Sequence, residues 1–209
     1  MEKAKKQTKK GLDEIKNFYT GDFIEIIIQC FKKPTDGLYS IFKTPSKKSL
    51  IHSLIIAVSV FILYLIGSYI VVGNGRKFLA FMDFVKMGLF PLMSMFLMAV
   101  LSFVIKSILG KADFKNELLT GAIGGIPFTI IILVSVIVQI FTKNNPLAIV
   151  NNPTLIGIIG TIIIFYALLM LINIFQQSLK SANVKDALAW YLSPVSIIAS
   201  IYLSYQILY

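Results

Sequence analysis

Five long apolar stretches separated by short polar segments dominate the hydrophobic pattern of this chain. They cover residues 49–72, 84–109, 118–141, 154–178 and 187–209. At about 1.5 Å of rise per residue, each is long enough to cross a hydrocarbon core of roughly 30 Å as an α-helix. Lipid cannot hydrogen-bond the backbone, and the stretches are too long and too continuously apolar for barrel strands. The pattern predicts an all-α polytopic membrane protein, a bundle of five transmembrane helices that occupies residues 49–209.

The residues before the first span divide into two parts. Residues 1–21 are rich in lysine and predict a mobile basic tail. In residues 22–48 the pattern becomes amphipathic: Asp22 and Glu25 have capping-box spacing, and apolar residues recur at helical intervals as far as Phe31, before Pro34 ends the helix. A short turn of helix follows at 38–43. This N-terminal amphipathic helix is expected either to lie in the membrane interface or to pack beneath the bundle as a plate.

Composition narrows the class of protein further. Apolar residues make up 56% of the chain, charged residues 14%, and the mean hydropathy is +0.80, so a water-facing fold is excluded. One cysteine, Cys30, excludes an internal disulfide and a multi-cysteine zinc site. One histidine, His52, cannot form the paired-histidine site of an intramembrane metalloprotease. We therefore expect a non-enzymatic protein without a metal or cofactor.

Basic residues predict the orientation. Of the 20 lysines and arginines, 16 lie on one side of the predicted membrane. Eleven of these precede the first span, and the rest are Lys106 and the lysines of the loops 110–117 and 179–186. The other 4 lie on the opposite side. Positive residues mark the cytoplasmic side, which puts the N-terminus inside and the C-terminus outside. Lysines beside the membrane attract anionic headgroups, so the net charge of +10 needs no nucleic acid. The headgroup-binding candidates are Lys32, Lys33, Lys43, Lys47 and Lys48.

Ionisable residues are nearly absent from the predicted spans. Asp83 and Lys86 stand at the outer end of span two at i, i+3 spacing, where they can form an ion pair. Lys106 lies near the inner end of the same span, from which its side chain can snorkel to water. Since ion- and proton-coupled transporters carry charged groups within the membrane, this pattern disfavours them.

Glycine and proline are the informative residues inside the spans. Gly121 and Gly125 form a small-xxx-small pair, which permits close helix approach, and Pro127 is expected to kink the same span. Two readings stay open, ordinary tight packing and a broken-helix binding site like those of transporters. The full set of packing and kink candidates is Pro91, Gly121, Gly124, Gly125, Pro127, Gly157, Gly160 and Pro194.

The order of these features resembles the Yip1 domain family, which has a cytoplasmic N-terminal region and five spans. The local matches are KPTDGLYSI at 33–41, LGKADF at 109–114 leading to Leu118-Leu119 and Ile126-Pro127, and SANVKDA at 181–187. The tyrosine- and glycine-rich span signatures of eukaryotic members are not evident, so a role with Rab-type GTPases is not carried over. The single cysteine excludes the zinc ribbon of many prokaryotic relatives.

The resemblance implies a non-enzymatic scaffold, adaptor or accessory subunit that binds another membrane protein or complex in transport, export or membrane organisation. A small-solute channel or carrier that uses the kinked spans is the first alternative, and an immunity or resistance protein against membrane-active peptides is the second. The Lys-, Ile- and Asn-rich composition points to a prokaryotic plasma membrane.

Overall fold

The computed structural model describes residues 11–44, 49–109, 112–144 and 153–209. These described parts of the chain are helical apart from short connections, and no strand occurs in them. The predicted all-α bundle is therefore confirmed. Five segments are long and apolar enough to cross a membrane, which makes the chain a multi-pass membrane protein.

The observed helices follow the predicted apolar stretches to within a few residues, except that span three consists of two helices. The helices that form the spans are α4 (Ser49–Val72), α5 (Phe81–Leu109), α6 (Phe114–Ile123), α7 (Gly125–Asn144), α9 (Pro153–Ser181) and α10 (Asp186–Leu208). Span three begins earlier than hydropathy indicates because its first turn is polar. Asp113 caps that turn by accepting a hydrogen bond from Lys115 N at 3.2 Å.

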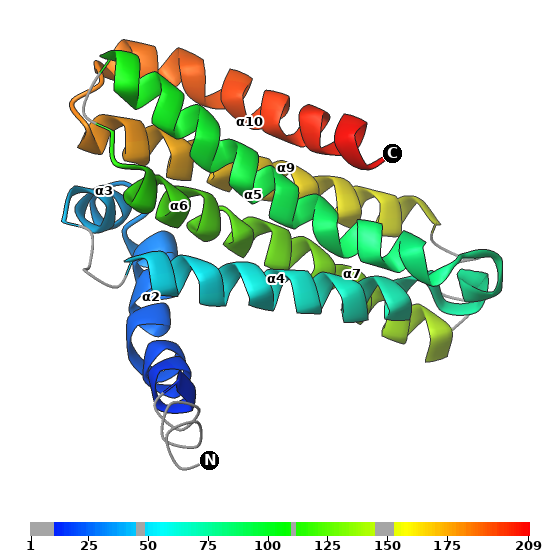
Figure 1. Ribbon diagram of the computed structural model, residues 1–209. Coiled ribbons are helices and arrows are strands. Elements are labelled where there is room, and N and C mark those ends of the chain that lie inside the picture. The colour runs from blue at the N-terminus through cyan, green and yellow to red at the C-terminus, as the bar shows by residue number, and fades with distance from the viewer. Residues whose placement is uncertain (1–10, 45–48, 110–111, 145–152) are drawn as a thin grey trace.

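Consecutive spans lie side by side and run in opposite directions (Figure 1). We call the end at which α4 begins the basal end; it also holds α2 (Phe23–Lys32), α3 (Asp36–Lys43) and residues 182–185. The distal end holds η2 (Gly73–Phe78), a short 3₁₀-helix, and Tyr209. At the basal end, α9 stops in a Schellman motif, in which Asn183 adopts φ 65° and Val184 N donates to Leu179 O at 3.3 Å.

The third span is interrupted at Gly124, between α6 and α7. The sequence predicts a kink from Pro127, and the structure shows how it arises. In a continuous helix the proline ring would clash with the carbonyl of the residue four positions earlier, Ile123. Ending α6 at Ile123 and restarting at Gly125 places Pro127 in the first turn of α7, where a missing N–H is tolerated.

The glycines of span three allow it to approach α5 and α4 closely. A Cβ added at Gly121 would clash with the Met95 carbonyl oxygen, and one at Gly125 would lie 2.8 Å from Val60 Cγ2. A Cβ added at Gly124 would likewise lie too close to the Met98 side chain. The small-xxx-small pair predicted from the sequence therefore packs inside this chain, which leaves it unavailable to another protein.

The remaining glycine and proline candidates lie in different surroundings. Gly157 and Gly160 have no atom within 4 Å of an added Cβ, so they do not pack against a neighbouring helix. Pro91 is buried inside α5, and Pro194 is half-buried inside α10.

Helical structure in the N-terminal region begins before the predicted start at Asp22. Residues 11–17 are helical and continue through a π-helical turn, η1 (Phe18–Asp22), into α2. Asp22 makes no side-chain cap, so the predicted capping box is wrong. The helix starts earlier because Phe18 is buried against His52 of α4, with the ring centroids 4.6 Å apart.

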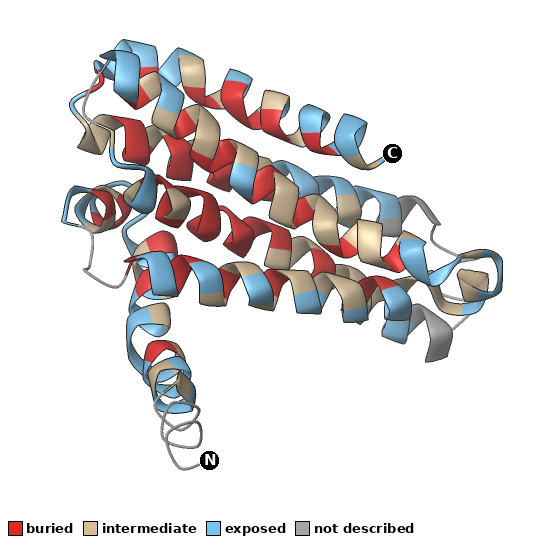
Figure 2. Cartoon of the chain, viewed as in Figure 1, coloured by how far each residue is buried: buried red, intermediate tan, exposed pale blue. Residues whose placement is uncertain are grey.

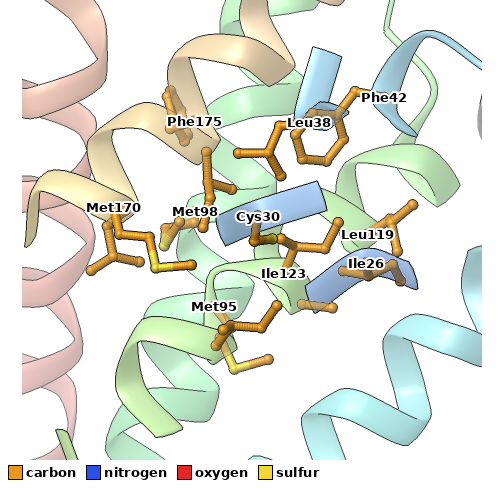
Figure 3. Packing of buried hydrophobic residues seen from close by; sticks show 14 of the residues in the cluster. Ile26, Cys30, Leu38, Phe42, Met95, Met98, Leu119, Ile123, Met170 and Phe175 are labelled. Atoms are coloured by element: carbon orange, nitrogen blue, oxygen red, sulfur yellow. The ribbon is translucent and has the colours of Figure 1, made fainter. Parts of the chain in front are cut away.

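Buried residues gather on the inward faces of the spans (Figure 2). Many large apolar side chains are exposed on the outside of the spans. The two N-terminal helices share the same core. In Figure 3, Cys30 of α2 and Leu38 of α3 lie beside Ile123 and Phe175 of the spans. Burial raises the pKa of the Cys30 thiol to about 12. The α2–α3 pair is therefore packed against the basal end of the bundle.

We expect Gly121→Ala to destabilise the bundle by about 1–3 kcal/mol, because its methyl group must displace the α5 backbone. Gly157→Ala is the matched control. It should be neutral or slightly stabilising, since the site is open and alanine is the better helix former. Thermal unfolding of both variants in detergent micelles measures the difference, and equal melting temperatures would contradict the packing described here.

Candidate functional site

A lysine and a glutamate meet inside the bundle at the centre of a polar cluster. Lys106 Nζ of α5 donates to both carboxylate oxygens of Glu117 of α6, at 2.9 Å and 2.7 Å. Both residues are 3% exposed. Such an ion pair within a membrane protein needs a full set of partners, because an unpaired charge in a low-dielectric interior is strongly unfavourable.

Three hydroxyl groups complete this cluster. Ser178 Oγ of α9 accepts from Lys106 Nζ at 2.7 Å and lies 2.6 Å from Thr120 Oγ1. Ser102 Oγ donates to Glu117 Oε2 at 2.6 Å. We call these five residues, Lys106, Glu117, Ser102, Thr120 and Ser178, the ionic centre. Together they join α5, α6 and α9, and every buried side-chain nitrogen or oxygen in the described part of the chain has a partner.

The spacing along α5 explains why Lys106 points inward. Met95, Ala99, Ser102 and Lys106 are all buried, and their separations of three or four residues put them on one helix face. Snorkelling of Lys106 to water, which the sequence suggested, is therefore wrong. Lys106, Glu117 and Ser178 each lie about one turn from the basal ends of their helices, and Ser102 and Thr120 lie about one turn deeper. At this end α3 packs on the bundle through Leu38 and Phe42.

Sequence reasoning missed the ionic centre because it placed Glu117 outside the third span. Two signals could have indicated it. Lys106 continues the buried, small-residue face of α5, and Glu117, Thr120 and Gly121 form a similar face at the start of α6. A lysine and a glutamate in register on two such faces are candidates for a buried ion pair.

A second polar group lies at the basal end, between α2, α3 and α4. His52 is 6% exposed, and its Nε2 lies 3.2 Å from Oδ2 of Asp22. These two residues, with Glu25, Gln29 and Thr44, line a cavity of about 250 Å³. Within the described residues, no group of three His, Cys, Asp or Glu side chains is arranged to hold a metal ion.

Asp83 and Lys86, the predicted outer ion pair, are half-buried. Asp83 Oδ2 accepts from Ala80 N at 2.8 Å, and Lys86 Nζ lies 5.6 Å from the centre of the Tyr209 ring. The ion pairs within 4 Å found in the described ranges do not include Asp83 with Lys86.

Of the five headgroup candidates, Lys32, Lys33 and Lys43 are exposed at the basal end, and Lys47 and Lys48 lie outside the described residues. Lys43 Nζ donates to the Tyr39 hydroxyl at 3.1 Å.

Cavities also open on the flanks of the spans. One of about 360 Å³ lies between α4, α5 and α6, with small side chains, Ser53, Ala57 and Ala122, and exposed ones, Leu54 and Phe96, among its lining. Its lining is almost entirely apolar. Others, of about 330 Å³ and 250 Å³, adjoin α7. These hollows face the surface that contacts lipid or another membrane helix.

Comparison with family models, with curated proteins and with solved structures finds no match for this chain. The geometry of the chain itself therefore has to support any functional conclusion.

Removing one member of the ion pair should destabilise the protein strongly. We expect Glu117→Leu and Lys106→Met each to lower the unfolding free energy by about 3 kcal/mol, because each leaves a buried charge unpaired. The double variant should recover most of that loss, since neither charge remains. Chemical unfolding in micelles measures all three.

Asp186→Asn is the matched control for this cycle. It breaks the pair between Lys180 and the largely exposed Asp186 at 3.4 Å, which we expect to contribute less than about 1 kcal/mol. Single variants with wild-type stability, or a double variant as unstable as the sum of the two, would contradict the proposed coupling.

Proposed function

We propose that this chain is a non-enzymatic membrane scaffold or adaptor, an accessory subunit that binds another membrane protein. The observation that carries the proposal is the contrast between the interior and the flanks. The charged groups inside the bundle are bound by partners from the same chain, whereas an apolar cavity of about 360 Å³ is open on the flank. Contact with a neighbour through the flank is favoured over chemistry in the interior.

The lining of the flank cavity supports contact with a helix. Ser53 and Ala57 are four residues apart on α4, and Ala122 of α6 lines the same cavity; Ser53 and Ala122 are buried in the free chain, and Ala57 is half-buried. Small side chains at this spacing let a helix backbone approach closely, and the larger Leu54 and Phe96 beside them offer apolar area. The glycine pair in span three already packs against α5 and α4 of the same chain, so this flank is the more suitable surface for a partner.

The resemblance to the Yip1 domain family points in the same direction, since it implies a non-enzymatic five-span protein. We also propose that the basal end faces the cytoplasm of a prokaryotic cell, because basic residues predominate there among the described residues. Lys16, Lys32, Lys33, Lys43, Lys115, Lys180 and Lys185 lie at that end, against Arg76, Lys77 and Lys86 at the distal end.

Cross-linking in native membranes tests this function. A photo-reactive residue at Leu54, which lines the flank cavity, is compared with one at Ile162 of α9; both side chains are 61% exposed. We expect a defined adduct from position 54, identified by mass spectrometry, that position 162 does not give and that Ala57→Leu abolishes. Recovery of the uncrosslinked monomer alone from both positions would contradict the proposal.

A carrier is the second candidate, favoured by the break in span three beside the ionic centre. Broken helices and intramembrane charges are features of transporter binding sites. Under this alternative, proteoliposomes holding a pH-sensitive dye would pass protons, and Glu117→Gln would slow the flux. Vesicles that remain as proton-tight as protein-free ones would contradict a proton-linked carrier.

A further inference from the structure

The N-terminal helix runs at a steep angle to the spans and extends outward from the basal end beside α4 (Figure 1). It carries apolar side chains that the bundle does not cover. Three contacts hold it against α4. Phe18 packs on the His52 ring, Asp22 pairs with His52, and the Tyr19 hydroxyl is hydrogen-bonded to Ser59 Oγ. Ser59 lies ten residues into α4, about 15 Å from its basal end at 1.5 Å per residue. The helix therefore lies beside the first turns of the first span.

The residues of α2 divide into three faces. Ile26 and Cys30 are buried against the bundle. At about 100° per residue, Ile24, Ile28 and Phe31 fall within an arc of roughly 60°, and they are 49%, 43% and 47% exposed. Glu25 and Gln29 lie on the polar side and line the basal cavity. We call the three exposed residues, Ile24, Ile28 and Phe31, the outer apolar face.

Helix geometry relates the outer apolar face to the other sides of α2. Phe23 is in ring contact with Tyr19, whose hydroxyl reaches toward the distal end at Ser59, so that side of the helix points away from the basal cavity. At about 100° per residue, Phe23 and Ile27 lie between the buried side of α2 and its outer apolar face, and Glu25 and Gln29 lie across the helix from Phe23 and Ile27. Ile51 of α4, which is 40% exposed, lines a small cavity together with Phe18 and Asp22, so the exposed apolar surface of α4 adjoins the N-terminal helix.

We propose that residues 11–32 form an in-plane membrane helix whose outer apolar face binds the lipid acyl chains of the leaflet at the basal end. The partner is a lipid surface, because the face adjoins the flank of a membrane span and exposed lysines, Lys32 and Lys33, follow it directly in the chain. This inference goes beyond the proposed function and does not depend on it. It leaves the polar side of α2 and the α3 helix as the surfaces accessible from water.

Depth-dependent fluorescence quenching tests this assignment. The single tryptophan, Trp190, is replaced by phenylalanine, and a new tryptophan is placed at Ile24 or at its polar neighbour Glu25. The purified proteins are reconstituted into phosphatidylcholine–phosphatidylglycerol vesicles with brominated acyl chains. We expect Ile24→Trp to be quenched several-fold more by the bromolipid than Glu25→Trp, and Glu25→Trp to be quenched more by aqueous iodide.

Both positions are exposed, so the substitutions should not disturb folding, and a circular dichroism spectrum checks this. Equal quenching of the two tryptophans by iodide would overturn the proposal, since the face would then be in water. Protection of Ile24→Trp from both quenchers would overturn it as well, because a second protein surface would cover the face. Neither result depends on a protein partner in native membranes, so this experiment tests the lipid contact independently of the scaffold proposal.

Discussion

Absence of water from the bilayer interior is the constraint on which this structure depends. Every backbone group must be bonded within a helix, and every buried charge must find its partner within the protein. Lys106 and Glu117 meet this requirement with three hydroxyl groups from α5, α6 and α9. The pair thereby links these three helices near their basal ends.

The same constraint explains the third span. A helix that ends in the middle of a membrane leaves carbonyl and amide groups without intrahelical partners. Here the break is confined to Gly124, whose N–H donates to Thr120 O at 3.2 Å, and the surrounding residues 121–128 are all buried. The glycines allow α5 and α4 to close over the interruption. A feature that could form a binding site in a transporter is thus enclosed by packing, which fits a scaffold better than an open pathway.

The basal end differs from the rest of the bundle in being both packed and polar. Cys30 and Leu38 extend the core beyond the spans, and Asn173 Nδ2 donates to the Pro34 carbonyl at 2.7 Å, so the turn between α2 and α3 is bonded to α9. The sequence left open whether the N-terminal helix lies in the interface or packs on the bundle. Ile26 and Cys30 of α2 pack on the bundle, and the proposed lipid contact concerns the exposed side that carries Ile24, Ile28 and Phe31.

The sequence by itself determined the fold class, the five spans and their glycine and proline features, because hydrophobic length is a local property that the bilayer thickness selects. Only the tertiary structure decided that the Lys106 side chain is buried in an ion pair. Whether a lysine near a helix end reaches water or pairs in the interior depends on which face of α5 turns inward, and on Glu117 and Ser178, which lie 11 and 72 residues away along the chain. The early start of the N-terminal helix was decided likewise, since Phe18 gains its burial from His52 of α4. Non-local partners of this kind leave little trace in the periodicity of a single sequence.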